Sequence, residues 1–349
     1  MTKKKKFETI AIHVGNAPDE ITGSISPSIH LTSTYVQDDI GKNKGYDYSR
    51  GGNPTRSRLE ANIAALEGGC DAIAFASGMA ATTALFQRLK GGDHVIVSRN
   101  VYGGTYRMAT KVLSNHGIDF DFVDTTDLRN IKRKINEKTR WVFIETPTNP
   151  MLEITDIQAV AELCREFSLK LAVDNTFMST YGQRPLENGA DCVMHSTTKF
   201  ICGHSDVLGG ILVVKDESLA ESLHFIQKSG GAIPSPFDSW ILLRSVKTMS
   251  MRVQRASENA MALAKFFDCH PSITKTIYPG LSSHPQHEIA KKQQINPHGV
   301  ILYGSMISIV FDTKQYLDQF LSRIKLFTLA ESLGGVESLM SVPYFMTHA

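Results

Sequence analysis

The stretch CVMHSTTKFICGHSDVLGG, residues 192–210, decides how the rest of the chain is interpreted. It starts as an apolar strand and then enters a loop of hydroxyl residues and glycines around a single lysine, Lys199. A lysine is most often an exposed side chain, but loops at strand ends are where a sheet presents reactive groups. Because Ser196 and Thr198 beside it can bind an anion, Lys199 is a candidate Schiff-base nucleophile.

A second strand ends on a carboxylate. The run LAVDNT (171–176) is apolar up to Asp174, and the alternative interpretation of that aspartate is an Asx turn that closes the strand. A lysine at one strand end and a carboxylate at another suit pyridoxal phosphate, because the lysine bonds its aldehyde and the carboxylate keeps its ring nitrogen protonated. The pairing of Lys199 with Asp174 is therefore the central hypothesis.

Length and composition set the broad class. The chain has 349 residues and a formal net charge of +2, which favours about two domains and gives no indication of a nucleic-acid or membrane surface. Its basic run, Lys3–Lys6, is expected to be a solvated tail. No apolar stretch reaches the roughly 18 residues of a membrane helix, and none follows the lysines as in a secretory signal. The five cysteines are odd in number and scattered, which favours reduced thiols and a cytoplasmic location.

Short apolar runs alternate with amphipathic segments through the middle of the chain. Strands are expected at Ala72–Ala76, His94–Ser98, Phe120–Val123, Trp141–Glu145, Leu171–Val173, Cys192–His195 and Ile211–Val214. This alternation predicts an α/β fold with a mostly parallel sheet, whose ligands bind at the carboxyl ends of the strands. We expect an extended arm over residues 1–51 and a large α/β domain over 52–235. Residues 236–349 are expected to form a linking helix, from Pro236 to about Cys269, and a smaller α+β domain.

Three further groups are candidates for binding the phosphate or the ring. The run FASGMAA (75–81) predicts a strand, a turn and a helix start, so Gly78 and Met79 can offer backbone N–H groups to a phosphate. The alternatives are a plain βα turn and a dinucleotide site, which would require a G-x-G-x-x-G motif that this run lacks. Tyr102 is either a packing residue or an aromatic that stacks on a ring and donates a proton. Arg50 is either surface charge or a phosphate ligand.

A zinc site is an alternative use of the same region. Four potential ligands lie close in sequence: Cys192, His195, Cys202 and His204. Side chains alternate along a strand, so Cys192 and His195, three residues apart, point to opposite faces and do not share a metal. We therefore expect no metal site.

As a set, eight motifs resemble those of the Cys/Met-metabolism family of pyridoxal-phosphate enzymes. They are YSRGGNPT (48–55), FASGMAA (75–81), VYGGTYR (101–107), ETPTNP (145–150), VDNTF (173–177), HSTTKFICGHSDV (195–207), PGLSSHPQHE (279–288) and FTLAESLGGVESL (327–339). The resemblance covers nearly the whole chain. It implies fold type I, which is aspartate aminotransferase-like, and a homotetramer built from tight dimers.

The resemblance also implies roles for individual residues. Lys199 would carry the Schiff base, Asp174 would pair with the ring nitrogen and Tyr102 would stack on the ring. The cofactor site would further include Tyr48, Arg50, Gly78, Met79, Thr176, Ser196 and Thr198, with Tyr48 and Arg50 reaching the phosphate of the neighbouring subunit. Asn149 and Ser332 would lie beside the carboxylate of an amino-acid substrate.

The implied chemistry is elimination at the γ position, with Lys199 moving protons and Tyr102 assisting the leaving sulfur. Cystathionine would give cysteine, 2-oxobutanoate and ammonia. Addition of a cysteine thiol to an acylated homoserine would instead make this a γ-synthase, and a silent oligomer that keeps the fold is a third alternative. Methionine γ-lyases of the family usually carry cysteine at Gly104 and a small apolar residue at Glu331. An acidic Glu331 could receive the distal ammonium of cystathionine, which favours the lyase or the synthase.

One difference from the family lies at the end of the sequence, which finishes at Ala349. Relatives continue for a few dozen residues that include an arginine for the substrate carboxylate. The sequence is then either a fragment or one whose tail is unrecorded. For a protein that truly ends at Ala349, we expect cofactor binding to survive and substrate affinity to fall steeply.

Overall fold

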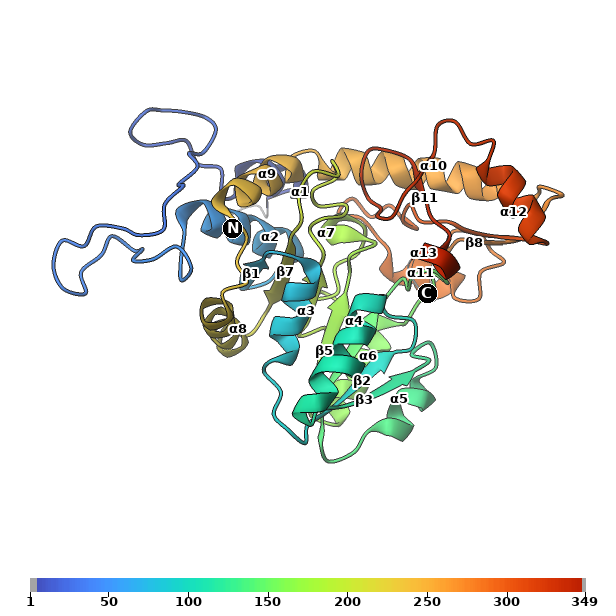
Figure 1. Cartoon of the computed structure of the whole chain (residues 1–349), viewed down its shortest axis with the longest axis horizontal. Helices are drawn as coiled ribbons and strands as arrows, with labels where there is room; N and C mark the ends of the chain where they lie inside the picture. Colours follow the sequence, from blue (N-terminus) through green and yellow to red (C-terminus); the bar gives the residue numbers. More distant parts are fainter. Residues whose placement is uncertain (1–4, 347–349) are drawn as a thin grey trace.

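Among residues 5–346, the part of the chain that this computed structural model describes, seven strands form one mixed sheet (Figure 1). They are β1 (Asp71–Phe75), β2 (His94–Ser98), β3 (Asp119–Val123), β4 (Thr139–Glu145), β5 (Lys170–Asp174), β6 (Cys192–His195) and β7 (Gly210–Val214). The order is β1-β7-β6-β5-β4-β2-β3, and β7 is antiparallel to both of its neighbours while the other pairs are parallel. The expected α/β fold with a mostly parallel sheet is confirmed.

Helices cover both faces of the sheet. On one face lie α2 (Pro54–Glu67), α5 (Leu128–Lys134) and α6 (Ile157–Glu166), and on the other lie α3 (Gly78–Phe86) and α8 (Glu217–Gly230). In β5, Leu171 and Val173 belong to the first apolar layer and Ala172 to the second, and all three are fully buried. Burial on both faces is why these strands are continuous apolar runs in the sequence. Two short elements follow strands: α4 (Gly103–Arg107), which continues into a π-helical turn η1 (Met108–Val112) and a 3₁₀ turn η2 (Leu113–His116), and α7 (Ser179–Gly182).

The carboxyl ends of the central strands meet at one edge. In the β4–β5 pair Glu145 lies opposite Asp174, and in the β5–β6 pair Asp174 lies opposite Met194. The loop that carries Lys199 starts directly after β6 ends at His195. The parallel register therefore brings the end of β5 and the lysine loop to the same edge of the sheet, where open α/β sheets bind their ligands.

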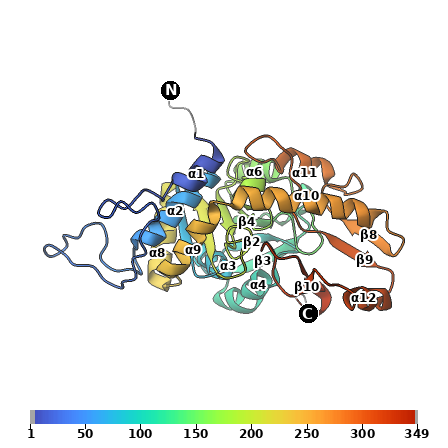
Figure 2. The same ribbon diagram turned by 90° about the horizontal axis from the view of Figure 1, so that it is seen from above.

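The C-terminal part begins with α9 (Pro236–Val246) and α10 (Met249–Asp268). Figure 2 shows α10 running from the end of α9 to β8 (Ile273–Ile277), which pairs antiparallel with β9 (Ser308–Phe311). The remaining elements are α11 (His287–Gln293), α12 (Lys314–Leu321), β10 (Thr328–Leu329), β11 (Leu339–Met340) and α13 (Pro343–Met346). After α9 and α10, the chain thus forms a group of short strands and helices that is smaller than the seven-stranded sheet and its covering helices.

The expectation of one uninterrupted helix from Pro236 to about Cys269 is wrong, because the chain breaks at Lys247–Thr248. The carbonyl of Ser245 accepts bonds from Thr248 Oγ1 at 3.2 Å and from Arg252 Nη2 at 3.0 Å. The side chains of Thr248 and Arg252 thus satisfy the Ser245 carbonyl, which lies in the last turn of α9. No glycine or proline marks the break, so the sequence pattern did not reveal it.

The N-terminal segment differs from the expected extended arm at one place. Residues Phe7–His13 form a helix, α1, whose Phe7 and Ala11 are buried against α2. The residues between α1 and α2 extend away from the body (Figure 1). Of the basic run Lys3–Lys6, the first two residues lie outside the described part of the chain.

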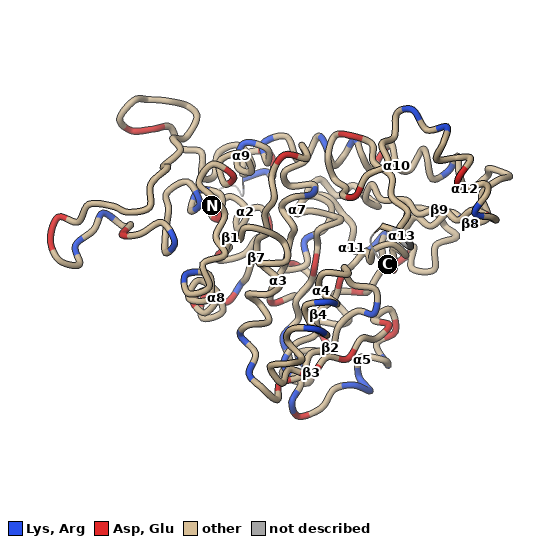
Figure 3. The backbone as a smooth tube through the Cα atoms, viewed as in Figure 1, with Lys and Arg blue, Asp and Glu red and all other residues tan. Residues whose placement is uncertain are grey.

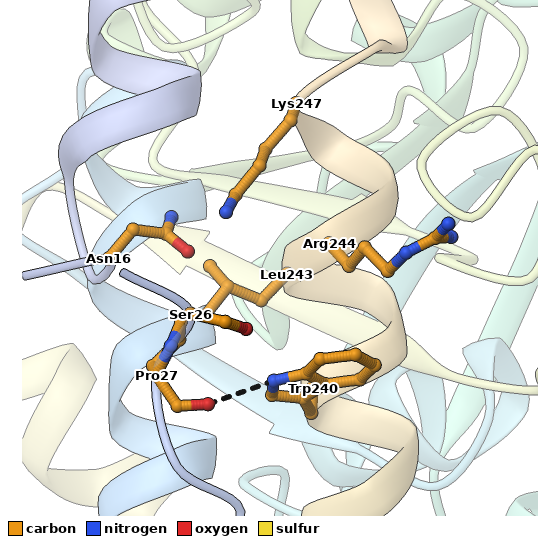
Figure 4. A pocket seen from close by; sticks show the side chains of 7 residues that line it. All are labelled: Asn16, Ser26, Pro27, Trp240, Leu243, Arg244 and Lys247. Atoms are coloured by element: carbon orange, nitrogen blue, oxygen red, sulfur yellow. Dashed lines mark hydrogen bonds between the residues drawn. The ribbon is translucent and has the colours of Figure 1, made fainter. Parts of the chain in front are cut away.

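The root of this arm is fixed to α9. Trp240 Nε1 donates a hydrogen bond of 3.0 Å to the carbonyl of Pro27 (Figure 4). The two residues line a cavity of about 150 Å³ together with Asn16, Ser26, Leu243, Arg244 and Lys247. This cavity contains none of the residues expected to bind the cofactor.

Charged residues of both signs are spread along the chain (Figure 3), in keeping with the small net charge of +2. Across residues 5–346 no helix is both long and apolar enough to cross a membrane.

Candidate active site

Lys199 lies in a tight turn directly after β6. Its backbone N–H donates to the carbonyl of Ser196 at 3.2 Å, and its carbonyl accepts from Gly203 N at 2.8 Å. The half-buried amine Nζ donates to Ser332 Oγ at 2.8 Å. Burial lowers the pKa of Lys199, and the negative charge of Glu331 partly opposes that shift. A lowered pKa increases the fraction of neutral amine, the form that acts as a nucleophile or a base.

Asp174 is buried, with only 6% of its surface exposed, at the end of β5. Its Oδ1 accepts from Thr176 N at 3.0 Å, and Thr176 Oγ1 in turn accepts from Ser196 N at 2.9 Å. Burial raises the pKa of Asp174, while the bonds from Thr176 and the charge of His195 oppose the rise. Thr176 therefore links the carboxylate to the start of the loop that carries Lys199, and a cation beside Asp174 would stabilise the ionised form.

A second buried carboxylate, Glu145, lies beside Asp174, and the sequence analysis did not identify it as a site residue. Glu145 is 5% exposed, and its pKa is raised well above the usual value by burial and by the negative charge of Asp174. Within residues 5–346 neither carboxylate forms an ion pair with Lys, Arg or His. A glutamate directly after the apolar run Trp141–Ile144 was the available signal.

The start of α3 lies against the lysine loop. Ser77 caps the helix by accepting from Ala80 N at 3.0 Å, and a Cβ built on Gly78 would lie 2.8 Å from Ser196 Cβ. A helix leaves its first N–H groups without partners inside the helix, which makes this end suited to a phosphate. Thr198 Oγ1 binds both the carbonyl and the N–H of Gly209, at 3.2 and 3.0 Å. Gly78 at the start of α3 therefore lies directly against Ser196 in the lysine loop, and Thr198 in the same loop is fixed to Gly209.

Tyr102 and Met79 converge on Gly104. A Cβ built there would lie 2.6 Å from Tyr102 Cε1 and 2.7 Å from Met79 Sδ. The Tyr102 side chain is 45% exposed, so its ring faces open space beside the start of α3. This location places an aromatic ring at the same sheet edge as Asp174.

The expected substrate residues lie around this edge. Asn149 N donates to Glu145 Oε1 at 3.2 Å, which fixes the loop after β4. Ser332, the partner of Lys199, has a φ of 101°, a backbone conformation that non-glycine residues rarely adopt. Such strain is typical of functional positions. Glu331 is exposed, and its charge acts on Lys199.

Tyr48 and Arg50 lie together on the arm. The guanidinium carbon of Arg50 is 5.5 Å from the centre of the Tyr48 ring, and Arg50 Nη1 donates to the carbonyl of Lys228 at the end of α8. Within one chain Arg50 therefore contacts α8, whereas Lys199 contacts the segment around Ser332.

Two supporting residues escaped the sequence analysis because their contacts are distant in sequence. Arg252 donates to the carbonyls of Phe200 and Ile201 at 2.8 and 3.3 Å, and burial lowers its pKa to about 10. Gly334 has a φ of +81°, and a Cβ there would lie 2.6 Å from Phe200 N and 2.8 Å from the Lys199 carbonyl carbon. Both residues hold the lysine turn in place.

We expect Gly334→Ala to lower kcat/KM by about 100-fold, because the added methyl group would force the Ser332 segment away from the Lys199 backbone. Steady-state kinetics of the cofactor-saturated protein measure this. The matched control is Gly299→Ala, since Gly299 also has a positive φ (+79°) but has no atom within 4 Å of a built Cβ. Equal losses in the two variants would show that backbone strain alone, and not the contact with Lys199, is responsible.

Comparisons with known proteins bear on this site. A family model described as Cys/Met metabolism PLP-dependent enzyme matches residues 8–349. The chain is 47% identical over 344 residues to the cystathionine gamma-lyase of Bacillus subtilis, covering 99% of this chain and 89% of that protein. It is also 47% identical to the cystathionine gamma-synthase of Mycobacterium leprae, covering 98% and 87%. The structure of cystathionine gamma-lyase from Lactobacillus plantarum complexed with L-serine superposes with a TM-score of 0.95 at 43% identity, covering 99% and 88%.

Proposed function

The chain belongs to the family of Cys/Met metabolism PLP-dependent enzymes, and we propose that within this family it is a cystathionine γ-lyase. The type I, aspartate aminotransferase-like fold and the family resemblance expected from the sequence are confirmed by the comparisons. The chain is therefore a pyridoxal-phosphate enzyme that acts on small molecules. The proposed reaction converts cystathionine and water to cysteine, 2-oxobutanoate and ammonia.

The residues at the sheet edge fit pyridoxal phosphate. A buried carboxylate with a raised pKa, Asp174, suits a protonated ring nitrogen, and the glycine-tight start of α3 beside Ser196 suits a phosphate. Lys199 offers an amine whose pKa is lowered by burial. Thr176, Thr198 and Met79 would complete the site. When bound, the cofactor supplies an electron sink for the negative charge that develops at the substrate Cα.

Lys199 and Tyr102 would perform the proton transfers. With the substrate in place, Lys199 Nζ would take the proton from Cα and pass it to the bound cofactor, and this transfer returns the amine to its neutral form before it takes a proton from Cβ. Its lowered pKa is favourable for both transfers. Tyr102 Oη donates a proton to the leaving γ-sulfur. Ser332 Oγ, which accepts from Lys199 Nζ at 2.8 Å, orients that amine.

Recognition of cystathionine would depend on both ends of the molecule. In this proposal Asn149 and Ser332 bind the α-carboxylate. It is supported by the bond of Asn149 N to Glu145 at the carboxyl edge of the sheet and by the bond of Lys199 to Ser332. Glu331 is acidic and exposed near Lys199, and its carboxylate would receive the distal ammonium group. That acidic residue is the observation that carries the proposal of a cystathionine enzyme.

A γ-synthase is the second candidate, because a relative named gamma-synthase is as similar to this chain as the relative named gamma-lyase. Product analysis separates the two. The purified protein with cystathionine alone is expected to release cysteine and 2-oxobutanoate, measured by chromatography of the products. Formation of cystathionine from an acylated homoserine and cysteine, without appreciable turnover of cystathionine alone, would instead establish the synthase. Absence of both reactions in cofactor-loaded protein would support a silent oligomer.

We also propose a cytoplasmic homotetramer whose active sites are shared between subunits. Tyr48 and Arg50 would reach the phosphate of the neighbouring subunit. The arm that carries them exposes large apolar side chains, between 71% and 97% of whose surface is accessible: Ile21, Ile25, Leu31, Val36 and Ile40. Five large apolar side chains exposed on one segment favour burial against a protein partner. Analytical ultracentrifugation of the loaded protein tests this, and a monomer would contradict it.

A further inference from the structure

Glu145 connects two loops at the carboxyl edge of the sheet. Its Oε2 accepts a hydrogen bond of 2.7 Å from the backbone N–H of Tyr102, and its Oε1 accepts one of 3.2 Å from the backbone N–H of Asn149. Tyr102 directly precedes α4 as its N-cap residue, and Asn149 lies in the loop after β4. One side chain therefore fixes the main chain of two residues that are 47 positions apart in sequence.

Glu145 is itself held rigidly, because it ends a buried central strand. The residue ends a central strand whose other side chains from Trp141 to Ile144 are buried, so its backbone has little freedom. Its own N–H donates to Ser98 Oγ at 3.3 Å, at the end of the neighbouring strand β2. Groups held by rigid strands position their partners better than groups held by loops do.

Burying a carboxylate next to Asp174 is unfavourable, since two negative charges at adjacent strand ends repel each other. A purely structural link between the two loops could be made by an uncharged side chain at lower electrostatic cost. A carboxylate, however, has two equivalent acceptor oxygens and no donor, which matches two converging N–H groups.

We propose that Glu145 is a positioning residue that sets the locations of Tyr102 and Asn149 together. This inference rests on the proposed function, in which Tyr102 protonates the leaving sulfur and Asn149 binds the substrate carboxylate. A displaced Tyr102 lowers kcat, and a displaced Asn149 raises KM. Loss of Glu145 therefore affects both constants.

The test variant is Glu145→Gln, which keeps the size of the side chain but offers one acceptor oxygen and an NH₂ group that repels the second N–H. The matched control is Glu153→Gln. Glu153 is a neighbouring carboxylate that binds side chains of the same loop, Arg99 and Asn100, at 2.6 and 3.0 Å, and not the backbone of Tyr102. Should Glu145→Gln fail to fold, the shorter but still charged Glu145→Asp replaces it.

Two readouts are measured on cofactor-saturated protein. Hydrogen–deuterium exchange with mass spectrometry is expected to show faster exchange at Tyr102 and in the 146–151 loop for Glu145→Gln, and no change there for Glu153→Gln. Steady-state kinetics are expected to show kcat/KM lowered about 10- to 100-fold, divided between kcat and KM, for Glu145→Gln alone. Exchange does not depend on the substrate, so it tests the positioning even if cystathionine proves not to be turned over.

Unchanged exchange in both segments would overturn the proposal, as would faster exchange with unchanged kinetic constants. An equal loss of kcat/KM in Glu153→Gln would also overturn it, because the effect would then belong to the loop in general. If Glu145→Gln changes exchange as expected but wild-type protein turns over no cystathionine, the positioning stands and the proposed function fails.

Discussion

Lys199→Ala is expected to lower kcat/KM for cystathionine by at least about 1,000-fold, because one substitution removes both the amine that bonds the cofactor and the base that moves the protons. In the wild type, burial lowers the pKa of this lysine, and its amine is oriented by Ser332 at 2.8 Å. No other lysine amine donates to Ser332 within residues 5–346. Steady-state kinetics with cystathionine measure the loss. Borohydride treatment followed by peptide mass spectrometry should find a pyridoxyl group on residue 199 of the wild type and on no lysine of the variant.

The matched control is Lys247→Ala. The pKa of Lys247 is also lowered by burial, but this residue lines the small cavity between the arm and α9 and lies outside the proposed site (Figure 4). It should keep near wild-type kinetics and still carry the pyridoxyl group on Lys199. A pyridoxyl group on any other lysine of the wild type, or full activity in Lys199→Ala, would contradict the assignment.

The sequence predicted the sheet well because each central strand is buried on both faces and is therefore a continuous apolar run. His94–Ser98 and Cys192–His195 were predicted with their observed bounds. The turn that we propose to bind the phosphate could also be predicted from the sequence, since Ser77 and Gly78 mark the end of a strand and the start of a helix by local chemistry. Strand bounds and helix starts that are set by residues adjacent in sequence can thus be predicted from the sequence.

Features that depend on residues far apart could not be inferred in this way. Gly334 has a local signal for a turn, but its close approach to the Lys199 backbone exists only in three dimensions. Arg252 looks like an ordinary helical arginine, yet it binds the carbonyls of Phe200 and Ile201. Glu145 was seen as the last residue of a strand, but only the register of β4 with β5 places it opposite Asp174. The interruption at Lys247–Thr248 was missed for a different reason: no glycine or proline marks it, and the Ser245 carbonyl is bound by the nearby side chains of Thr248 and Arg252.

Asp174→Asn is expected to weaken pyridoxal-phosphate binding by about 150- to 4,000-fold, the range that corresponds to the roughly 3–5 kcal/mol of breaking a buried charge pair. The asparagine keeps the size of the side chain and can still accept from Thr176 N, so the site should stay folded. It offers no negative charge to a protonated ring nitrogen, which is then buried without a counter-ion. Fluorescence titration of cofactor-free protein with pyridoxal phosphate measures the dissociation constant.

The control for this prediction is Asp191→Asn, at the opposite edge of the same two strands. Asp191 precedes β6 and pairs with Lys170 at the start of β5, at 2.9 Å. Removing this partly exposed ion pair should change stability by at most about 1 kcal/mol and leave cofactor affinity unchanged. The two variants thus make the same chemical change at the two ends of β5. If they weaken binding equally, the effect comes from the sheet as a whole. A loss confined to Asp174→Asn requires that the ring nitrogen be bound at the carboxyl end of the strand.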